Sequence, residues 1–386
     1  MSQTKPSNLV AIAIIAGLFF IFGFVTWING ALIPFMKTIN ELTDAQSYLV
    51  ASASYISFVV MALPASYILN KIGYRSGMAL GLFIMAIGAL VFIPAAEART
   101  YWVFLTGIFI QGVGMTILQT AANPYITILG PIESGAKRIA IMGIANKTAG
   151  ALGSLIFGAL LLSGIDEVKE KLGTVSLEEK NQLLDSMADS VFVPYLVMAL
   201  VLLVLGLLIR KAPLPNVEAK PLEEANEGED SKTSIFQFPQ VVLGSMAIFS
   251  YLGVEVISGD TINLYGSTLY MENFSILTAY TMSFMGVGYI IGVSAIPRFI
   301  SQSGALMISA IVGLLCIFGI IFSSIDETYI SEIIWSWAGL AIIPNSVFFV
   351  AMVGLANAMV WPSISRLRLM GLENLPLKVH RCLLWG

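Results

Sequence analysis

Charged residues are scarce in this sequence, and their scarcity excludes an ordinary soluble fold. Only 11% of the 386 residues are Asp, Glu, Lys or Arg, whereas 57% are hydrophobic; a soluble domain carries about 25% charged residues. The net charge is −4 and no basic cluster is present, so a nucleic-acid partner is excluded as well. The composition predicts an integral membrane protein, with the lipid bilayer as its surroundings.

Cysteine and histidine are also nearly absent. The two cysteines, Cys316 and Cys382, lie far apart, and the only histidine is His380, close to the last residue. This usage favours neither a disulfide framework nor a metal site. No Gly-rich phosphate loop and no nucleophile beside a base occurs in the sequence. We therefore expect no enzymatic activity, no metal and no organic cofactor.

Long apolar runs are abundant. A helix needs about 18 or more mostly apolar residues to cross a bilayer, and the sequence contains ten such segments, at residues 9–36, 47–69, 77–96, 101–129, 139–164, 190–209, 237–266, 277–297, 304–323 and 333–362. The prediction is an all-α polytopic membrane protein. A Pro- and Glu-rich stretch that cannot bury a core separates the first six spans from the last four. The predicted domains are an N-terminal six-helix bundle (1–210), a cytoplasmic linker (211–236) and a C-terminal bundle (237–386).

The distribution of Lys and Arg predicts the orientation. Ten basic residues fall on the side of the N-terminus and five on the opposite side. Because Lys and Arg are enriched in cytoplasmic loops, the N-terminus is expected in the cytoplasm. The only long loop on the opposite side contains Ser176-Leu177-Glu178-Glu179, a capping box that predicts the start of a short helix.

One apolar segment is interrupted by amides and a proline, in the string Gln119-Thr120-Ala121-Ala122-Asn123-Pro124. A buried amide in a bilayer is costly unless a partner or ligand satisfies it, so polar groups at this depth often mark a transport path. This string favours a membrane transporter.

Several strings resemble known transporters. Two groups of spans joined by a charged linker, and the loop Asn70-Lys71-Ile72-Gly73-Tyr74-Arg75, resemble the major facilitator superfamily, with Gly permitting a tight turn. The longer strings Ala62-Leu63-Pro64-Ala65, Phe92-Ile93-Pro94-Ala95-Ala96-Glu97, Gln119 to Tyr125, and Leu129-Gly130-Pro131 followed by Arg138 resemble the fucose permease family of sugar symporters. Gly143-Ile144-Ala145-Asn146-Lys147 and Tyr251-Leu252-Gly253-Val254-Glu255 are most similar to its glucose/galactose transporter branch.

The chain departs from that family at two positions. The resemblance implies a membrane-embedded aspartate and a glutamate, both linked to proton coupling, where this sequence has Gly30 and Gln119. Neither residue can titrate. If transport is proton-coupled, another group has to carry the proton.

Amides and one aromatic residue form the candidate sugar site. A hexose presents hydroxyls that both donate and accept, which amides can match at fixed spacing, and an apolar face that an aromatic ring can cover. In each case the alternative is structural: an amide can bond a neighbouring helix or backbone freed by a proline, and Trp27 can serve as packing or an interfacial anchor. The candidates are Trp27, Asn29, Gln119, Asn123 and Asn146.

Three charged residues within spans are the candidate ion-coupling group. Glu255 is the foremost candidate for the coupling residue, because it is expected near mid-membrane, where a carboxylate is either paired or protonated. Lys147 could pair with Glu255 or with Asp260. The roles left open for Glu255 are ion coupling, direct sugar binding and a purely structural pair.

After Pro362 the sequence changes character. Basic residues crowd together and no further span fits. Because duplicated transporters have matched halves, six spans followed by four favour a C-terminal bundle that lacks two spans, through truncation or a shifted reading frame. A natural basic tail is the alternative.

The resemblance implies a hexose transporter of the glucose/galactose type in the cell inner membrane that works by alternating access, and we expect it to be a monomer. The expected coupling ion is H+, with Na+ as the alternative. Three other hypotheses remain: an uncoupled sugar facilitator, a membrane sugar sensor, and a defective product that lacks two spans.

Overall fold

The computed structural model describes most of the chain as helices. The described residues are 8–129, 135–162, 165–172, 174–212, 214, 239–271, 274–296 and 298–369. The linker expected at 211–236 and the basic tail lie mostly outside them. Within this described part, nine helices are long and apolar enough to cross a membrane, and one of them, Asp44–Glu97, has 54 residues. That helix is long enough to cross twice, so the described helices account for ten crossings, of which the last, Asn345–Ile364, begins later than the predicted span 333–362.

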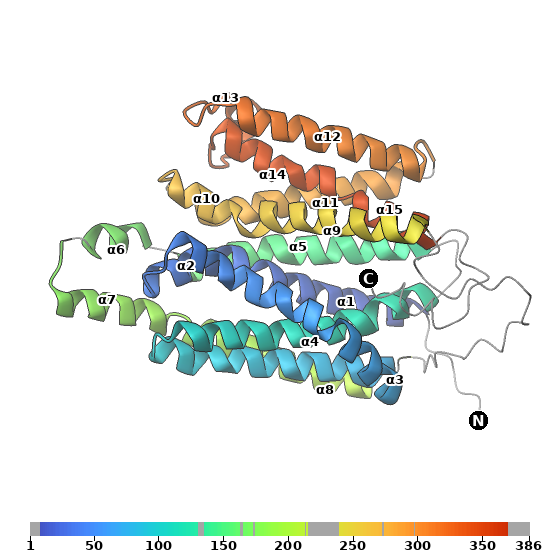
Figure 1. The fold of residues 1–386 in the computed structure, drawn as a ribbon, viewed down its shortest axis with the longest axis horizontal. Helices are drawn as coiled ribbons and strands as arrows, with labels where there is room; N and C mark the ends of the chain where they lie inside the picture. The colour runs from blue at the N-terminus through green and yellow to red at the C-terminus, as the bar shows by residue number, and fades with distance from the viewer. Residues whose placement is uncertain are drawn as a thin grey trace, which may run out of the picture.

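The first half of the chain forms one group of packed helices (Figure 1). α1 packs on α5, and α3 packs on α4 and α8. The elements, in chain order, are α1 (Asn8–Trp27), α2 (Asn29–Ile39), α3 (Asp44–Glu97), α4 (Tyr101–Ile128), α5 (Gly135–Leu161), α6 (Ile165–Leu172), α7 (Leu177–Asp189) and α8 (Phe192–Lys211).

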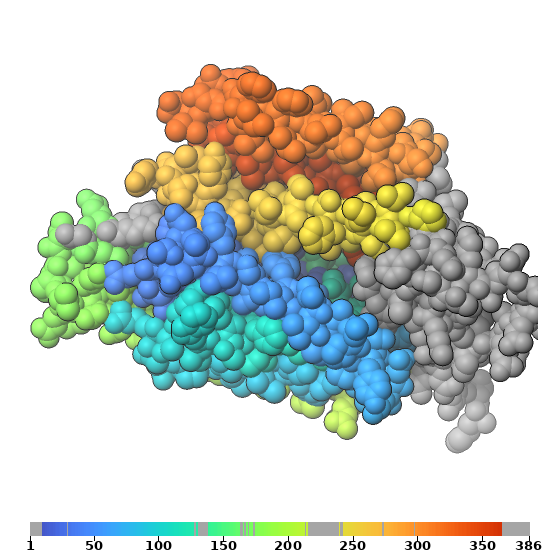
Figure 2. Space-filling model, in the orientation of Figure 1, coloured from blue at the N-terminus to red at the C-terminus, as the bar shows by residue number. Residues whose placement is uncertain are grey.

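The second half forms a smaller group in which α14 packs on α11 and α12, and α15 packs on α9. Its elements are α9 (Pro239–Asp260), α10 (Ile262–Thr268), η3 (Phe274–Ile276), α11 (Leu277–Ala295), α12 (Gln302–Phe322), α13 (Tyr329–Trp335), η4 (Ser336–Ala338), α14 (Asn345–Asn357) and α15 (Val360–Leu369). In Figure 2 the yellow surface of α9 lies between the blue N-terminal helices and the orange α12.

Glycines on α5 let the two halves approach closely. A Cβ atom at Gly143 would lie 2.6 Å from the Tyr289 ring on α11, and one at Gly158 would lie 2.9 Å from the backbone oxygen of Ser275 in η3. Glycines on α3 and α4 do the same within the N-terminal half, where Gly81 lies against Gly114. Glycines on three helices thus permit close contact between neighbouring helices.

The long helix α3 is really two spans joined at Gly73. That residue has φ 78° and ψ 165°, a conformation that only glycine adopts readily. The chain then folds back, since a Cβ atom at Gly77 would meet the side chain of Leu69. Beyond the turn, the Arg75 guanidinium donates to the carbonyl oxygens of Ile209 and Arg210 in the last turn of α8. The tight turn predicted here is confirmed.

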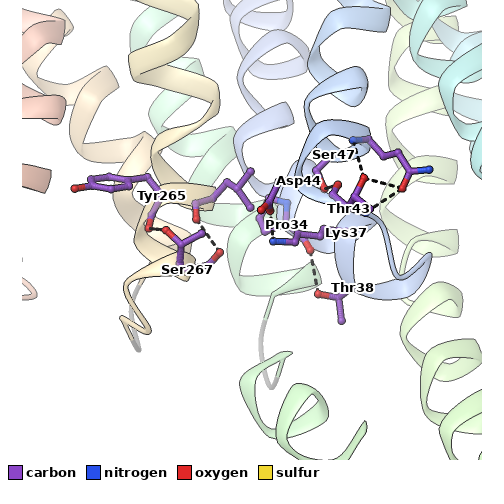
Figure 3. Close-up of polar contacts among 11 residues, drawn as sticks. Pro34, Lys37, Thr38, Thr43, Asp44, Ser47, Tyr265 and Ser267 are labelled. Carbon is purple, nitrogen blue, oxygen red and sulfur yellow. Dashed lines mark hydrogen bonds and ion pairs between the residues drawn. The ribbon is translucent and has the colours of Figure 1, made fainter. Parts of the chain in front are cut away.

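The end of the molecule that carries α7, on the left in Figure 1, is called the α7 end below. The capping box predicted at Ser176 is present and opens α7. α7 is tied to the N-terminal half by ion pairs of Arg99 with Asp185 and of Lys180 with Glu41. Figure 3 shows the neighbouring turn into α3, where the Thr43 hydroxyl accepts from the backbone N–H of Gln46 and Lys37 pairs with Asp44.

The last predicted span, 333–362, is not one helix. α13 ends at Trp335, a 3-10 turn follows, residues 339–344 are non-helical, and only then does α14 begin at Asn345. Pro344 precedes α14, and Gly339 has a positive φ of 67°. Gly339 ends the 3-10 turn and Pro344 disfavours helix in the residue before it, and an average of hydropathy registers neither effect.

We predict that Gly73→Ala lowers the thermal stability of the purified protein in detergent. An L residue in this conformation costs about 1–3 kcal/mol. Gly286→Ala is the matched control, because Gly286 is helical and no atom lies within 4 Å of a Cβ placed there. Equal melting temperatures for Gly73→Ala and the parent would contradict the role given to this turn.

Candidate functional site

Two helices that lie at the boundary between the halves are broken near their α7 ends. α1 gives way to α2 at Ile28, and α9 gives way to α10 at Thr261. Interrupted helices at corresponding positions of the two halves are typical of transporter binding sites. The backbone groups and polar side chains near these breaks are therefore candidates for function.

Asn263 connects the breaks to each other. Its side-chain amide donates to the backbone oxygens of Gly30 (2.9 Å) and Ser275 (3.2 Å), and its Oδ1 accepts from the backbone N–H of Thr278 (2.9 Å). Asn263 is fully buried. A single side chain thus links α10 with α2, η3 and α11 across the boundary between the halves.

Gly30 has no room for a side chain in this arrangement. A Cβ atom there would lie 2.2 Å from the Thr278 hydroxyl oxygen. The position at which the family resemblance implies an aspartate is therefore a close backbone contact in this protein.

A buried ion pair also crosses the boundary. Lys147 on α5 pairs with Glu255 on α9, and both residues are only 5% exposed. The Lys147 ammonium lies 4.4 Å from the centre of the Trp27 ring, at cation–π distance. Of the two partners considered for Lys147, the structure selects Glu255, and this geometry fits both the structural and the coupling role left open for that carboxylate.

Asp260 lies five residues beyond Glu255 and has different partners. It is completely buried, and its Oδ2 accepts a hydrogen bond of 2.8 Å from the Tyr55 hydroxyl on α3. Its Oδ1 has no hydrogen-bond partner among the described residues. This contact is a third link between the halves.

Trp27 and Asn146 belong to the same cluster. The Trp27 indole N–H points to Asn146 Oδ1 at 3.4 Å, and the Asn146 amide points to the Phe19 backbone oxygen, also at 3.4 Å. Trp27 is 3% exposed, and Cβ atoms at Gly150 and Gly259 would touch its ring. In this conformation Trp27 packs between helices, so a sugar could reach it only after the halves move apart.

The two amides of α4, Gln119 and Asn123, form no hydrogen bond with the residues of this cluster. Gln119 and Asn123 are half-buried, and four residues apart they share a face of the helix. Neither side chain forms a hydrogen bond with another described residue. They are available to a ligand, whereas Asn146 is engaged by Trp27 and Phe19. The side chain of Asn29 lies outside the described part of the structure.

Two surface hollows found in the described part lie away from this cluster. One, of about 230 Å³, is lined by residues of α3, α7 and α8 that include Glu97 and Phe192. The other lies at α6 and includes Lys171. The candidate site is therefore assigned from its polar side chains and its position between the halves.

Sequence reasoning missed several residues of the cluster. Tyr55 and Asn263 make direct contacts to it, and the hydroxyls of Tyr251 and Tyr289 lie next to Glu255. Tyr251 stands in a string that carries the family resemblance, but tyrosine is common in membrane helices. The sequence signal for these residues is a hydroxyl or amide group within an apolar span. That signal does not indicate which neighbouring helix the group contacts.

Comparison with known proteins places the chain in a family. A family model described as the Major Facilitator Superfamily matches residues 15–368, and the chain belongs to that superfamily. The resemblance drawn from the sequence strings is thereby confirmed, as is the expectation of a membrane transporter and not an enzyme.

Curated relatives and solved structures agree with this assignment. A glucose/galactose transporter of Brucella abortus biovar 1 (strain 9-941) is 34% identical over 365 residues, which cover 92% of this chain and 79% of the relative. An L-fucose-proton symporter of Escherichia coli (strain K12) is 32% identical over 64% of this chain and 58% of its own. A crystal structure of the E. coli fucose:proton symporter matches 98% of this chain and 88% of its own, with a TM-score of 0.71 and 23% identity, and so supports the fold.

We predict that replacing one partner of the buried ion pair destabilises the protein more than replacing both partners together. Lys147→Met and Glu255→Gln each leave a buried charge or polar group unpaired, which costs about 3–5 kcal/mol when one partner of a buried pair is removed. The double variant should recover part of that loss. Thermal unfolding of the four proteins in detergent completes the double-mutant cycle, and simple additivity of the two single effects would show that the residues are uncoupled.

We also predict that Gly30→Ala destabilises the closed contact with Thr278. Forcing a methyl group into this space costs about 1–3 kcal/mol. Thr278→Gly removes the obstructing side chain, so Gly30→Ala/Thr278→Gly should be more stable than the sum of the single changes implies. The measurement is again thermal unfolding, and a Gly30→Ala protein as stable as the parent would refute the close contact.

Proposed function

We propose that this protein transports a hexose of the glucose/galactose type across the cell inner membrane by alternating access, as a proton symporter. The observation that carries the proposal is the buried charged cluster of Lys147, Glu255 and Asp260 at the boundary between two helical halves. The 34% identity to a glucose/galactose transporter over 79% of its length supports the substrate class.

Amides on the N-terminal half would hold the sugar. Gln119 and Asn123 are half-buried and make no hydrogen bonds with described residues, so their donors and acceptors are free for hydroxyl groups. Asn146 would join them when its long contacts to Trp27 and Phe19 are exchanged for shorter ones to the sugar. The same movement would uncover Trp27, and Asn29 completes the proposed set.

The charged cluster would couple the sugar to an ion. Charged groups inside a membrane protein are costly and usually functional. Each charged contact joins one half to the other, through Lys147 with Glu255 and through Tyr55 with Asp260. A change of charge on α9 therefore alters the free energy of contact between the halves, which is the requirement for coupling. H+ is the proposed ion, and Na+ is the alternative that the experiment distinguishes.

The proposed orientation follows from the basic residues. The N-terminus lies in the cytoplasm and the α7 end faces the outside. Lys and Arg are twice as frequent in the loops on the side of the N-terminus as in those on the opposite side. The contacts of Asn263 with Gly30 and of Tyr55 with Asp260 lie toward the α7 end and would have to separate to admit a sugar from outside. A monomer suffices, since both halves belong to one chain.

An uncoupled facilitator is the rival function, and one observation favours it. Gly30 and Gln119 stand where the family resemblance implies acids linked to proton coupling, and Gly30 has no space for a side chain. Hexose uptake into vesicles that ignores an imposed pH gradient would support the facilitator and reject the symporter.

We predict that Gln119→Ala weakens hexose transport. Loss of one neutral hydrogen bond costs about 0.5–1.5 kcal/mol, so the KM for counterflow of labelled glucose or galactose should rise about two- to tenfold. The measurement uses membrane vesicles or liposomes that contain the parent or the variant at equal amounts.

Gln111→Ala is the matched control. Gln111 is a buried amide on the same helix, but it packs against Gly88 of α3 within the N-terminal half. Its loss should lower stability and leave the KM unchanged. Equal KM values for Gln119→Ala and the parent would remove Gln119 from the sugar site.

A further inference from the structure

The charges buried at the boundary between the halves do not cancel. Lys147 is the only basic side chain in the described part of this cluster, and it is paired with Glu255. Asp260 is a second carboxylate on the same helix, and it forms no ion pair with any described residue. With both carboxyl groups ionised, the cluster has one positive and two negative charges, and the uncompensated charge belongs to Asp260.

The surroundings of Asp260 make that charge costly. The residue is 0% exposed, one of its oxygens accepts a hydrogen bond from the neutral Tyr55 hydroxyl, and the other oxygen has no partner in the described part. An isolated carboxylate in a low-dielectric interior is unfavourable by several kcal/mol or more, about the range in which a group neutralises instead.

The titratable and charged groups that face Asp260 come from each helix packed against it. They are Tyr55 on α3, Lys147 on α5 and Glu255 on α9 itself, and Tyr251 and Tyr289 lie beyond Glu255. Lys147 acts on Asp260 electrostatically, but its ion pair is with Glu255 and not with Asp260. Of these groups, Tyr289 belongs to α11, whereas Asn263 on α10 and Thr278 on α11, which lie close by, do not titrate.

We propose that Asp260 is the carboxyl group that binds the transported proton, and that Glu255 with Lys147 is the constant ion pair beside it. This inference rests on the proposed symport and assigns its proton to one residue. A proton from water at the open side adds to the free oxygen, Oδ1, and turns the carboxylate into a neutral acid. The same proton leaves to water on the other side after the halves have moved, and no other bond is made or broken.

Neutral Asp260 explains why the sugar and the proton would move together. When both sides close around the substrate, water is expelled and an uncompensated carboxylate would oppose closure. Protonation removes that penalty, so the loaded protein closes only with the proton bound. Tyr55 reports on the state of the acid, because its hydrogen bond to a charged carboxylate is stronger than its bond to a neutral one.

The decisive experiment is Asp260→Asn in liposomes loaded with a pH-sensitive dye. We expect labelled hexose counterflow, which needs no net proton movement, to persist. Accumulation driven by a pH gradient should be lost, so that the inside concentration rises no higher than the outside, and addition of sugar should no longer change the internal pH. Pronounced accumulation, or a normal sugar-evoked pH change, would overturn the assignment.

Asp44→Asn is the matched control, since Asp44 is an exposed aspartate paired with Lys37 at the turn into α3. It should accumulate sugar like the parent. If the parent itself shows neither counterflow nor uptake of any hexose, the proposed function fails. If the parent shows counterflow and uptake, but added sugar does not change the internal pH and a Na+ gradient drives uptake, the proton is the wrong ion.

A second measurement uses the parent protein and does not depend on the variant folding. Dicyclohexylcarbodiimide reacts with protonated carboxyl groups in apolar surroundings and leaves an adduct that peptide mass spectrometry can locate. We expect the adduct on Asp260, less of it at higher pH, and none on the paired Glu255. An adduct on Glu255 and not on Asp260 would reverse the two roles and overturn the proposal.

Discussion

The ion pair between Lys147 and Glu255 is the contact around which the two halves of this protein are arranged. Each residue is 5% exposed, so neither charge can be satisfied by water and each needs the other. The two residues lie on α5 and α9, which therefore have to come within reach of a side-chain contact. Trp27 adds its ring face to the Lys147 ammonium and so completes the environment of the cation.

Close approach of the halves depends on small residues and on broken helices together. Along α5, Gly143, Gly150 and Gly158 lie against an aromatic ring of α11, against Trp27 and against the backbone of η3. Pro34 inside α2 has no N–H to donate to the Gly30 oxygen, and Asn263, just beyond the break after α9, donates to that oxygen instead. The buried ion pair, the glycines of α5 and the Asn263 side chain thus all hold the two halves together in this closed arrangement.

Much of this arrangement could be predicted from the sequence, and the parts that could not share a physical cause. Most of the spans, the Gly73 turn and the Ser176 capping box depend on local chemistry, so they were predicted and are confirmed. The contact of Tyr55 with Asp260 depends on how each helix is rotated about its axis. In a membrane the lipid-facing and the inward-facing sides are both apolar, so periodicity gives little indication of that rotation. The interruption between α13 and α14 was missed for a related reason, because hydropathy over 333–362 stays high across a segment that Gly339 and Pro344 keep from being helical.

The buried acids of this protein lie at the same boundary between the two halves. The family resemblance implies acids in the N-terminal half, at the positions of Gly30 and Gln119, whereas this protein places Glu255 and Asp260 on α9 of the C-terminal half. Their partners, Lys147 and Tyr55, come from the N-terminal half, so both polar contacts cross the boundary between the halves. Coupling requires only that the charge be dehydrated when the halves close and hydrated when they open. Either half can supply that charge, and in this protein the N-terminal half uses the position of Gly30 for close packing against Thr278.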